Sequence, residues 1–120
     1  MTNNTKKPYS VMREYENIYF VSGQLPLNDL GIIVGEDFAT QAKQAIRNLR
    51  AILEQENVSI NNLLKITVFL ADINDYQEFN EIYLSELFDC ETMPARSAFQ
   101  VGALPMNAKI EVEGIFRKEQ

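Results

Sequence analysis

The sequence predicts an α+β fold in which two helices share one face of a β-sheet of four or five strands. Three observations support this prediction. The elements follow one another as strand, strand, helix, strand, helix, strand, strand. Two helices are too few to cover both faces of such a sheet. The length of 120 residues suits one domain, which we place over 1–120.

The two helices are predicted from apolar residues that recur every three or four positions. Asp37 can cap the first helix, because its carboxylate can accept the free amide hydrogens of the first turn. That helix should end near Asn57, and the second should cover roughly 75–88. The expected buried positions are Phe38, Ala42, Ala45, Ile46, Leu49, Ile52 and Leu53 in the first helix and Tyr76, Phe79, Ile82, Tyr83 and Leu87 in the second.

The strands are predicted from short runs rich in β-branched and aromatic residues. The first clear run covers 18–21, and a turn that includes Gly31 follows at 28–31. A strand over 64–70 has one apolar face, with Leu64 as its first apolar position, and Ser59 can cap a short turn before it. The segments 95–101 and 109–116 are expected to form an antiparallel pair across a loop that contains Pro105.

Composition and charge exclude several classes of chemistry. The 17 acidic and 11 basic residues give a net charge of −6, which would repel nucleic-acid phosphate. Because the chain has no histidine, it has no Ser-His-Asp triad, no Cys-His catalysis and no His-ligated metal site. Cys90 is the single cysteine and cannot form an intrachain disulfide, which fits a reducing cytoplasm. Pro8 and Tyr9 follow Lys6 and Lys7 in place of an apolar stretch, so no secretory signal is expected.

The sheet face that the helices leave uncovered is expected to carry charged groups, if side chains alternate regularly along the last two strands. The side chains assigned to that face are Arg96, Ala98 and Gln100 from the first strand and Glu111, Glu113 and Ile115 from the second. A β-bulge would shift either assignment by one residue and reverse its faces. Arg96 and Glu111 are therefore expected together, either as a polar site in an oligomer interface or as a solvated pair worth only about 0–1 kcal/mol.

Seven segments of the chain, in order and at matched spacing, share their pattern with one known family. They are PYS at 8–10, SGQLP at 22–26, KITVFL at 65–70, DINDY at 72–76, FNEIY at 79–83, PARSAFQVGAL at 94–104 and IEV at 110–112. This pattern resembles the RidA (YjgF) family of reactive-intermediate imine deaminases. Val112 departs slightly from it, because isoleucine or methionine is usual there, and about one residue is deleted near Asp89.

The resemblance implies a mixed sheet with two helices on one face. Three subunits of the family pack their uncovered sheet faces together in a trimer that resembles the bacillus-type chorismate mutase, with the sites in clefts between subunits. The implied reaction is hydrolysis of 2-aminoacrylate or 2-aminocrotonate and their imine tautomers to 2-keto acids and ammonia. A cytoplasmic homotrimer that acts on a small carboxylate without cofactor or metal is therefore expected.

The resemblance also implies the two main residues of the site. Arg96 stands at the family's carboxylate-binding arginine, and a guanidinium can hold a carboxylate through two parallel hydrogen bonds. Glu111 stands at the family's water-positioning glutamate, and imine hydrolysis needs a positioned water and proton transfers rather than a histidine. Glu113 lies on the same predicted face and competes for this role, and only the spacing from Arg96 selects Glu111.

Further substrate-binding positions are implied at Tyr9, Ser22, Gly23, Asn80 and Ala98. Lys7 replaces the glycine that is usual two residues before Tyr9, which puts the local backbone in doubt. Ala98 replaces a cysteine that is common in the family, and backbone groups make the contacts there. Cys90 is interpreted as a structural residue.

Two other functions remain open from the sequence. A regulator that binds 2-keto acids without turnover would use the same Arg96, and a Glu111→Ala variant would separate binding from deamination. A ribonuclease or translation inhibitor is a label that some family members carry. The acidic balance and the absence of a basic stripe in the sequence disfavour it.

Overall fold

A computed structural model describes residues 7–119. The prediction that the chain has no secretory signal rests partly on Lys6, which lies outside the described residues. The sheet contains β1 (Met12–Tyr15), β2 (Ile18–Gln24), β3 (Leu63–Leu70), β4 (Ala95–Gln100) and β5 (Ile110–Arg117). The helices are α1 (Phe38–Gln55) and α2 (Tyr76–Glu86), with single 3₁₀ turns η1 (Ile60–Asn62), η2 (Ile73–Asp75) and η3 (Pro105–Asn107).

The five strands form one mixed sheet in the order β1-β2-β5-β3-β4. Every pairing is antiparallel except that of β3 with β4, which is parallel. The predicted antiparallel pairing of 95–101 with 109–116 is therefore wrong. The helix α2 carries the chain back so that β4 runs alongside β3, and β5 then enters between β2 and β3, where it hydrogen-bonds on both edges.

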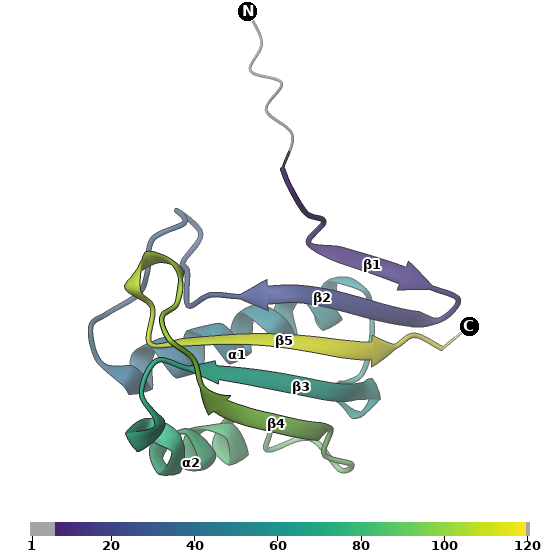
Figure 1. The fold of residues 1–120 in the computed structure, drawn as a ribbon. Coiled ribbons are helices and arrows are strands. Elements are labelled where there is room, and N and C mark those ends of the chain that lie inside the picture. The colour runs from purple at the N-terminus through teal and green to yellow at the C-terminus, as the bar shows by residue number, and fades with distance from the viewer. Residues whose placement is uncertain (1–6, 120) are drawn as a thin grey trace, which may run out of the picture.

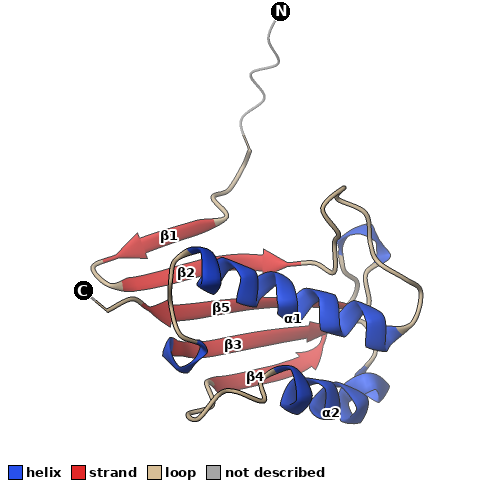
Figure 2. Ribbon diagram, turned by 180° about the vertical axis from the view of Figure 1, so that it is seen from behind, coloured by secondary structure: helices blue, strands red, loops and turns tan. Residues whose placement is uncertain are grey.

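Both helices lie on the same face of the sheet, which confirms the predicted α+β arrangement. Figure 2 shows α1 crossing the sheet and α2 below it near β4, whereas Figure 1 shows the opposite face with no helix over it. The Asp37 carboxylate accepts hydrogen bonds from the amide and hydroxyl of Thr40, so the predicted cap is present. The helix α1 ends at Gln55, two residues before the predicted Asn57, which has a positive φ of 59°. Ser59 caps η1, as predicted. None of the helices in residues 7–119 is long and apolar enough to cross a bilayer.

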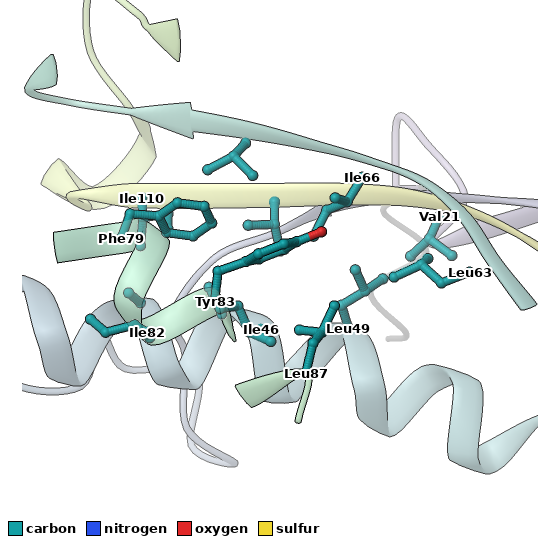
Figure 3. Close-up of a cluster of buried hydrophobic side chains, with 14 of the residues drawn as sticks. Val21, Ile46, Leu49, Leu63, Ile66, Phe79, Ile82, Tyr83, Leu87 and Ile110 are labelled. Carbon is teal, nitrogen blue, oxygen red and sulfur yellow. The ribbon is translucent and has the colours of Figure 1, made fainter. Parts of the chain in front are cut away.

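The hydrophobic core lies between the helices and the sheet (Figure 3). The first predicted helical stripe is buried except at the partly exposed Ile52, and in α2 the stripe from Phe79 to Leu87 is buried while Tyr76 is exposed. One prediction for β3 is wrong, because Leu64 is exposed and Leu63 takes its place in the core. The strand contains an extra residue at this point relative to β5, which turns Leu64 outward.

The face assignment was right for β5 and wrong for β4. In β5, Ile110, Val112, Gly114 and Phe116 are buried under the helices, and Glu111 lies on the open face. Residues paired across a ladder point to the same side, so Ala98, opposite the buried Val68, faces the helices, and Arg96 shares that side. Phe99, opposite Phe69, lies on the open face instead. The prediction failed because it placed the most apolar residues under the helices, whereas the open face is itself partly aromatic.

The open face carries aromatic side chains where a solvated sheet would carry polar ones. Phe20 and Phe99 are 47% and 44% exposed. The rings of Phe69 and Phe99 meet edge to face, with centroids 5.5 Å apart. Glu111 lies next to Phe69 on the same face, so the polar and apolar groups of this surface are contiguous.

Candidate active site

Glu111 lies in a hollow where β2 and β5 separate. A β-bulge puts both Ser22 and Gly23 opposite the single residue Glu113, between the pairs Val21–Gly114 and Gln24–Val112. Gly23 packs directly on the Glu111 carboxylate, and a Cβ at Gly23 would stand 2.7 Å from Glu111 Cδ. A side chain at this position would therefore displace the Glu111 carboxylate.

The N-terminal segment is attached to the same bulge. The Ser22 amide donates to the carbonyl of Val11 at 2.8 Å, and the Ser22 hydroxyl donates to the carbonyl of Ser10 at 2.6 Å. These bonds place Tyr9 at the rim of a cavity of about 420 Å³ that Ser22, Gly23 and Glu111 also line. Four of the predicted site residues, Tyr9, Ser22, Gly23 and Glu111, are therefore brought together.

A connected hollow of about 300 Å³ gives Glu111 an apolar surrounding. It is lined by Gly23, Phe69, Val101, Ala103, Leu104, Pro105, Glu111 and Glu113. Partial burial raises the pKa of the Glu111 carboxyl above its usual range, and the nearby negative charge of Glu113 raises it further. In the described chain no lysine or arginine forms an ion pair with either glutamate. Glu111 is therefore protonated more readily than an ordinary surface glutamate, which suits a group that accepts a proton.

Arg96 is held by one side of α2. Its Nη2 donates to Asn80 Oδ1 at 2.7 Å and to the Tyr76 hydroxyl at 3.1 Å. The guanidinium carbon also lies 4.9 Å from the ring centroid of Tyr83 and 5.4 Å from that of Phe79. These residues follow one another at helical spacing, so a single helix supplies a rigid seat for the guanidinium.

The charge of Arg96 is not neutralised by a carboxylate of the described chain. By contrast, three arginines form ion pairs with acidic side chains at 2.5–2.7 Å, namely Arg47, Arg50 and Arg117. Aromatic faces stabilise a cation without cancelling its charge. Arg96 is therefore held in place by its neighbours, and its positive charge can attract an anion.

The arginine and the glutamate form two separate half-sites. Arg96 and Asn80 lie on the helix side at the β4 edge, and Glu111 lies on the open side of β5, with β3 between the two strands. The prediction that Arg96 and Glu111 share one face of a chain is therefore wrong. Ala98 is next to Arg96 on β4, packs against the core and does not line the Glu111 hollow. One chain positions the two groups but does not bring them together.

Several residues at the two half-sites escaped sequence analysis. Phe69, Leu104 and Pro105 line the hollow at Glu111. Phe69 and Leu104 lie within the family motifs, but the resemblance gave them no role, and Pro105 lies outside the motifs. Tyr76 and Tyr83 were predicted only as members of a buried helical stripe. Asn80 lies at helical spacing between these two tyrosines. A polar residue within an aromatic stripe of a helix indicates that the stripe contacts a charged group.

In the described chain Cys90 forms no hydrogen bond with Arg96 and does not line the hollow at Glu111. Its thiol donates to the carbonyl of Thr92 at 3.0 Å. Burial, and next the charge of Asp89, raise the pKa of this thiol, so it stays protonated at neutral pH. Among residues 7–119, no group of three or more Cys, Asp or Glu side chains is placed to hold a metal ion.

Comparison with known proteins places this geometry in a family. A family model described as endoribonuclease L-PSP matches residues 2–117. The chain is 43% identical to a putative regulator, AldR, of Lactococcus lactis, with 90% of this chain and 85% of that protein covered. It is 39% identical to the 2-iminobutanoate/2-iminopropanoate deaminase of Mus musculus, with 90% and 79% covered.

A solved structure agrees with the same assignment. The crystal structure of the YjgF gene product of E. coli superposes with a TM-score of 0.85 at 34% identity, covering 93% of this chain and 89% of that one. The family model spans nearly the whole chain, and the relatives match it along most of their own length. The chain therefore belongs to the endoribonuclease L-PSP family, also called the YjgF/RidA family.

Proposed function

We propose that the chain is a deaminase that hydrolyses the imine tautomers of 2-aminoacrylate and 2-aminocrotonate to 2-keto acids and ammonia. The observation that carries the proposal is Arg96, which is seated on α2 and has no carboxylate partner among residues 7–119. The name of the mouse relative supports the reaction class. A single cysteine without a disulfide partner in the chain suits a reducing cytoplasm, where we place the protein.

Arg96 would bind the substrate carboxylate. Both substrates are small 2-imino acids, so each offers a planar carboxylate next to the reacting carbon. Nε and Nη1 of Arg96 make no hydrogen bond within the described chain, and Asn80 fixes the plane of the guanidinium. A fixed, uncompensated guanidinium binds such an anion more strongly than a lysine could.

Glu111 would act on the water. Its ionised carboxylate accepts a proton as water oxygen bonds to C2, and the imine nitrogen takes a proton from solvent, giving a tetrahedral carbinolamine. The proton taken by Glu111 then moves to the amine nitrogen, the C2–N bond breaks with its electron pair on nitrogen, and ammonia leaves. The remaining hydroxyl returns one proton to solvent as the C2=O bond forms. The raised pKa of Glu111 suits a group that both accepts and returns a proton.

The working unit is proposed to be a homotrimer. Arg96 and Glu111 lie on opposite faces of one chain, so a complete site needs the Arg96 of one subunit beside the Glu111 of the next. The partly exposed Phe20 and Phe99 give the open face the apolar surface that an interface between copies requires. A ring of three subunits would supply three equivalent clefts.

The hollow at Glu111 suits a short alkyl group. Phe69, Leu104 and Pro105 form its apolar side, and the glutamate its polar side. The methyl or ethyl group of the two substrates would lie against these residues, with C2 turned toward Glu111.

A coupled assay tests the proposal directly. Threonine dehydratase generates 2-aminocrotonate from threonine, and the release of 2-ketobutyrate and ammonia is followed with and without this protein. We expect faster release with the protein, and a loss of about 100-fold or more in this acceleration in Arg96→Ala, because the substrate carboxylate loses its cationic partner. Equal release with and without the wild-type protein contradicts the proposal.

A regulator that binds 2-keto acids without turnover is the second candidate. The name of the Lactococcus relative, a putative regulator, is the observation that favours it. The two functions differ in their need for Glu111, because binding a carboxylate needs the guanidinium and not the base. Glu111→Ala should abolish deamination in the first case. In the second case no variant shows turnover, and Glu111→Ala still binds 2-ketobutyrate.

A further inference from the structure

The hydrogen bonds of Arg96 leave no edge of its guanidinium free for a carboxylate. A planar carboxylate binds a guanidinium through two parallel hydrogen bonds along one edge, formed either by Nε and Nη2 or by Nη1 and Nη2. Both edges use one hydrogen of Nη2. In this structure Nη2 donates one hydrogen to Asn80 and the other to Tyr76. Two-pronged binding therefore requires that one of these two bonds be released.

The bond to Tyr76 is the one that can be exchanged. It is 3.1 Å long, whereas the bond to Asn80 is 2.7 Å long and half-buried. Tyr76 is 37% exposed, so its side chain can move toward solvent and replace this bond with one to water. A carboxylate is also a stronger acceptor for a guanidinium than a neutral phenol is.

We infer that the Tyr76 hydroxyl occupies, in the free protein, the Arg96 hydrogen that a bound carboxylate needs, and that ligand binding displaces it. Tyr76 then acts as a positioning residue that competes with the ligand. The phenol oxygen is fixed to its ring, so the ring, whose centroid lies 5.6 Å from the guanidinium carbon, shifts with the oxygen when the carboxylate binds. This inference rests on the proposed function, because it takes Arg96 as the carboxylate-binding group.

The inference predicts that removal of the hydroxyl strengthens binding. In Tyr76→Phe the ring remains over Arg96 and one guanidinium edge is free from the start. The dissociation constant for 2-ketobutyrate, measured by titration calorimetry, should fall about three- to tenfold, the usual effect of one exposed hydrogen bond to a charged group. Tyr15→Phe is the matched control, because Tyr15 is an exposed tyrosine of β1 and should leave the dissociation constant unchanged.

The outcomes separate this inference from the proposed function. Tighter binding by Tyr76→Phe, with Arg96→Ala unable to bind, supports both. Equal or weaker binding by Tyr76→Phe, while the wild type binds and Arg96→Ala does not, overturns the inference alone. If the wild type binds no 2-ketobutyrate, or if Arg96→Ala binds as well as the wild type, the proposed carboxylate site is wrong and the inference fails with it.

Discussion

At the scale of single residues, the contact of Gly23 with Glu111 determines where the carboxylate points. A methyl group at Gly23 would overlap the end of the Glu111 side chain and not a backbone atom. The glutamate can move aside, so we expect Gly23→Ala to fold with little loss of stability. Displacement of a catalytic group by about 1 Å can cost 100-fold in rate, and we expect a loss in kcat of this order in the coupled assay.

Gly102→Ala is the control for this prediction, because a Cβ at Gly102 would meet no atom within 4 Å. It should retain wild-type turnover. A Gly23→Ala variant that also retains wild-type turnover would contradict the placement of Glu111 in the reaction.

Glu113 should control the pH dependence of the reaction through Glu111. Its negative charge raises the pKa of the Glu111 carboxyl, so replacement by a neutral glutamine should lower that pKa. The proposed reaction needs the ionised Glu111, so turnover should be lost as the pH falls through this pKa. In Glu113→Gln the acid limb of the kcat profile should therefore move to lower pH.

The control for the pH profile is Glu78→Gln on the exposed surface of α2, which should leave the acid limb in place. Lys65 of β3 and Arg13 of β1 also face the open side, and salt screens the effect of their charges on Glu111. The pH profiles are therefore compared at one fixed ionic strength. An acid limb that is identical in Glu113→Gln and the wild type would show that Glu113 does not act on the titrating group.

At the scale of elements, Gln41 links the start of α1 to the start of β5. It is 3% exposed, accepts a hydrogen bond from the Lys109 amide at 2.9 Å, and donates to the Gly35 carbonyl at 3.2 Å. Gln41→Leu removes the bonds to both backbone groups and should reduce the free energy of unfolding by about 1–3 kcal/mol. Urea unfolding measures the effect, and Gln77→Leu on the exposed side of α2 is the control. Equal midpoints for Gln41→Leu and the wild type would contradict it.

The helices could be predicted from sequence because their evidence is local. The apolar spacing of α1 and the Asp37 cap lie within one segment, and both are present in the structure. Strand pairing depends on segments far apart in sequence. Nothing within 95–101 indicates that β4 pairs with β3 rather than β5, and nothing near Leu64 indicates a bulge.

Only part of the candidate site could be predicted from the sequence, because its residues lie in local motifs but their arrangement depends on distant segments. The motifs around Arg96 and Glu111 selected both residues by resemblance, but alternation placed Arg96 on the wrong face. An apolar pattern in the sequence indicates that a sheet face is covered. It does not indicate whether helices of the same chain or another subunit would cover that face. Phe99 was assigned to the helices for this reason and lies on the open face.

At the scale of the whole molecule, the two half-sites and the apolar open face have one common explanation. If neighbouring copies complete one another's sites, this explains three features of the chain. They are the arginine held by α2, the glutamate in a hollow on the other face, and the exposed phenylalanines. The central claim is therefore that each active site takes Arg96 from one subunit and Glu111 from another.

Mixing two inactive variants tests this claim most directly. Arg96→Ala and Glu111→Gln are each assayed alone, then unfolded together in equal amounts, refolded, and shown to form mixed oligomers by mass. Each site then has an even chance of an intact Arg96 and an independent even chance of an intact Glu111. We expect the mixture to recover about one quarter of wild-type activity. Mixed oligomers that remain as inactive as the two separate variants would contradict a site shared between subunits.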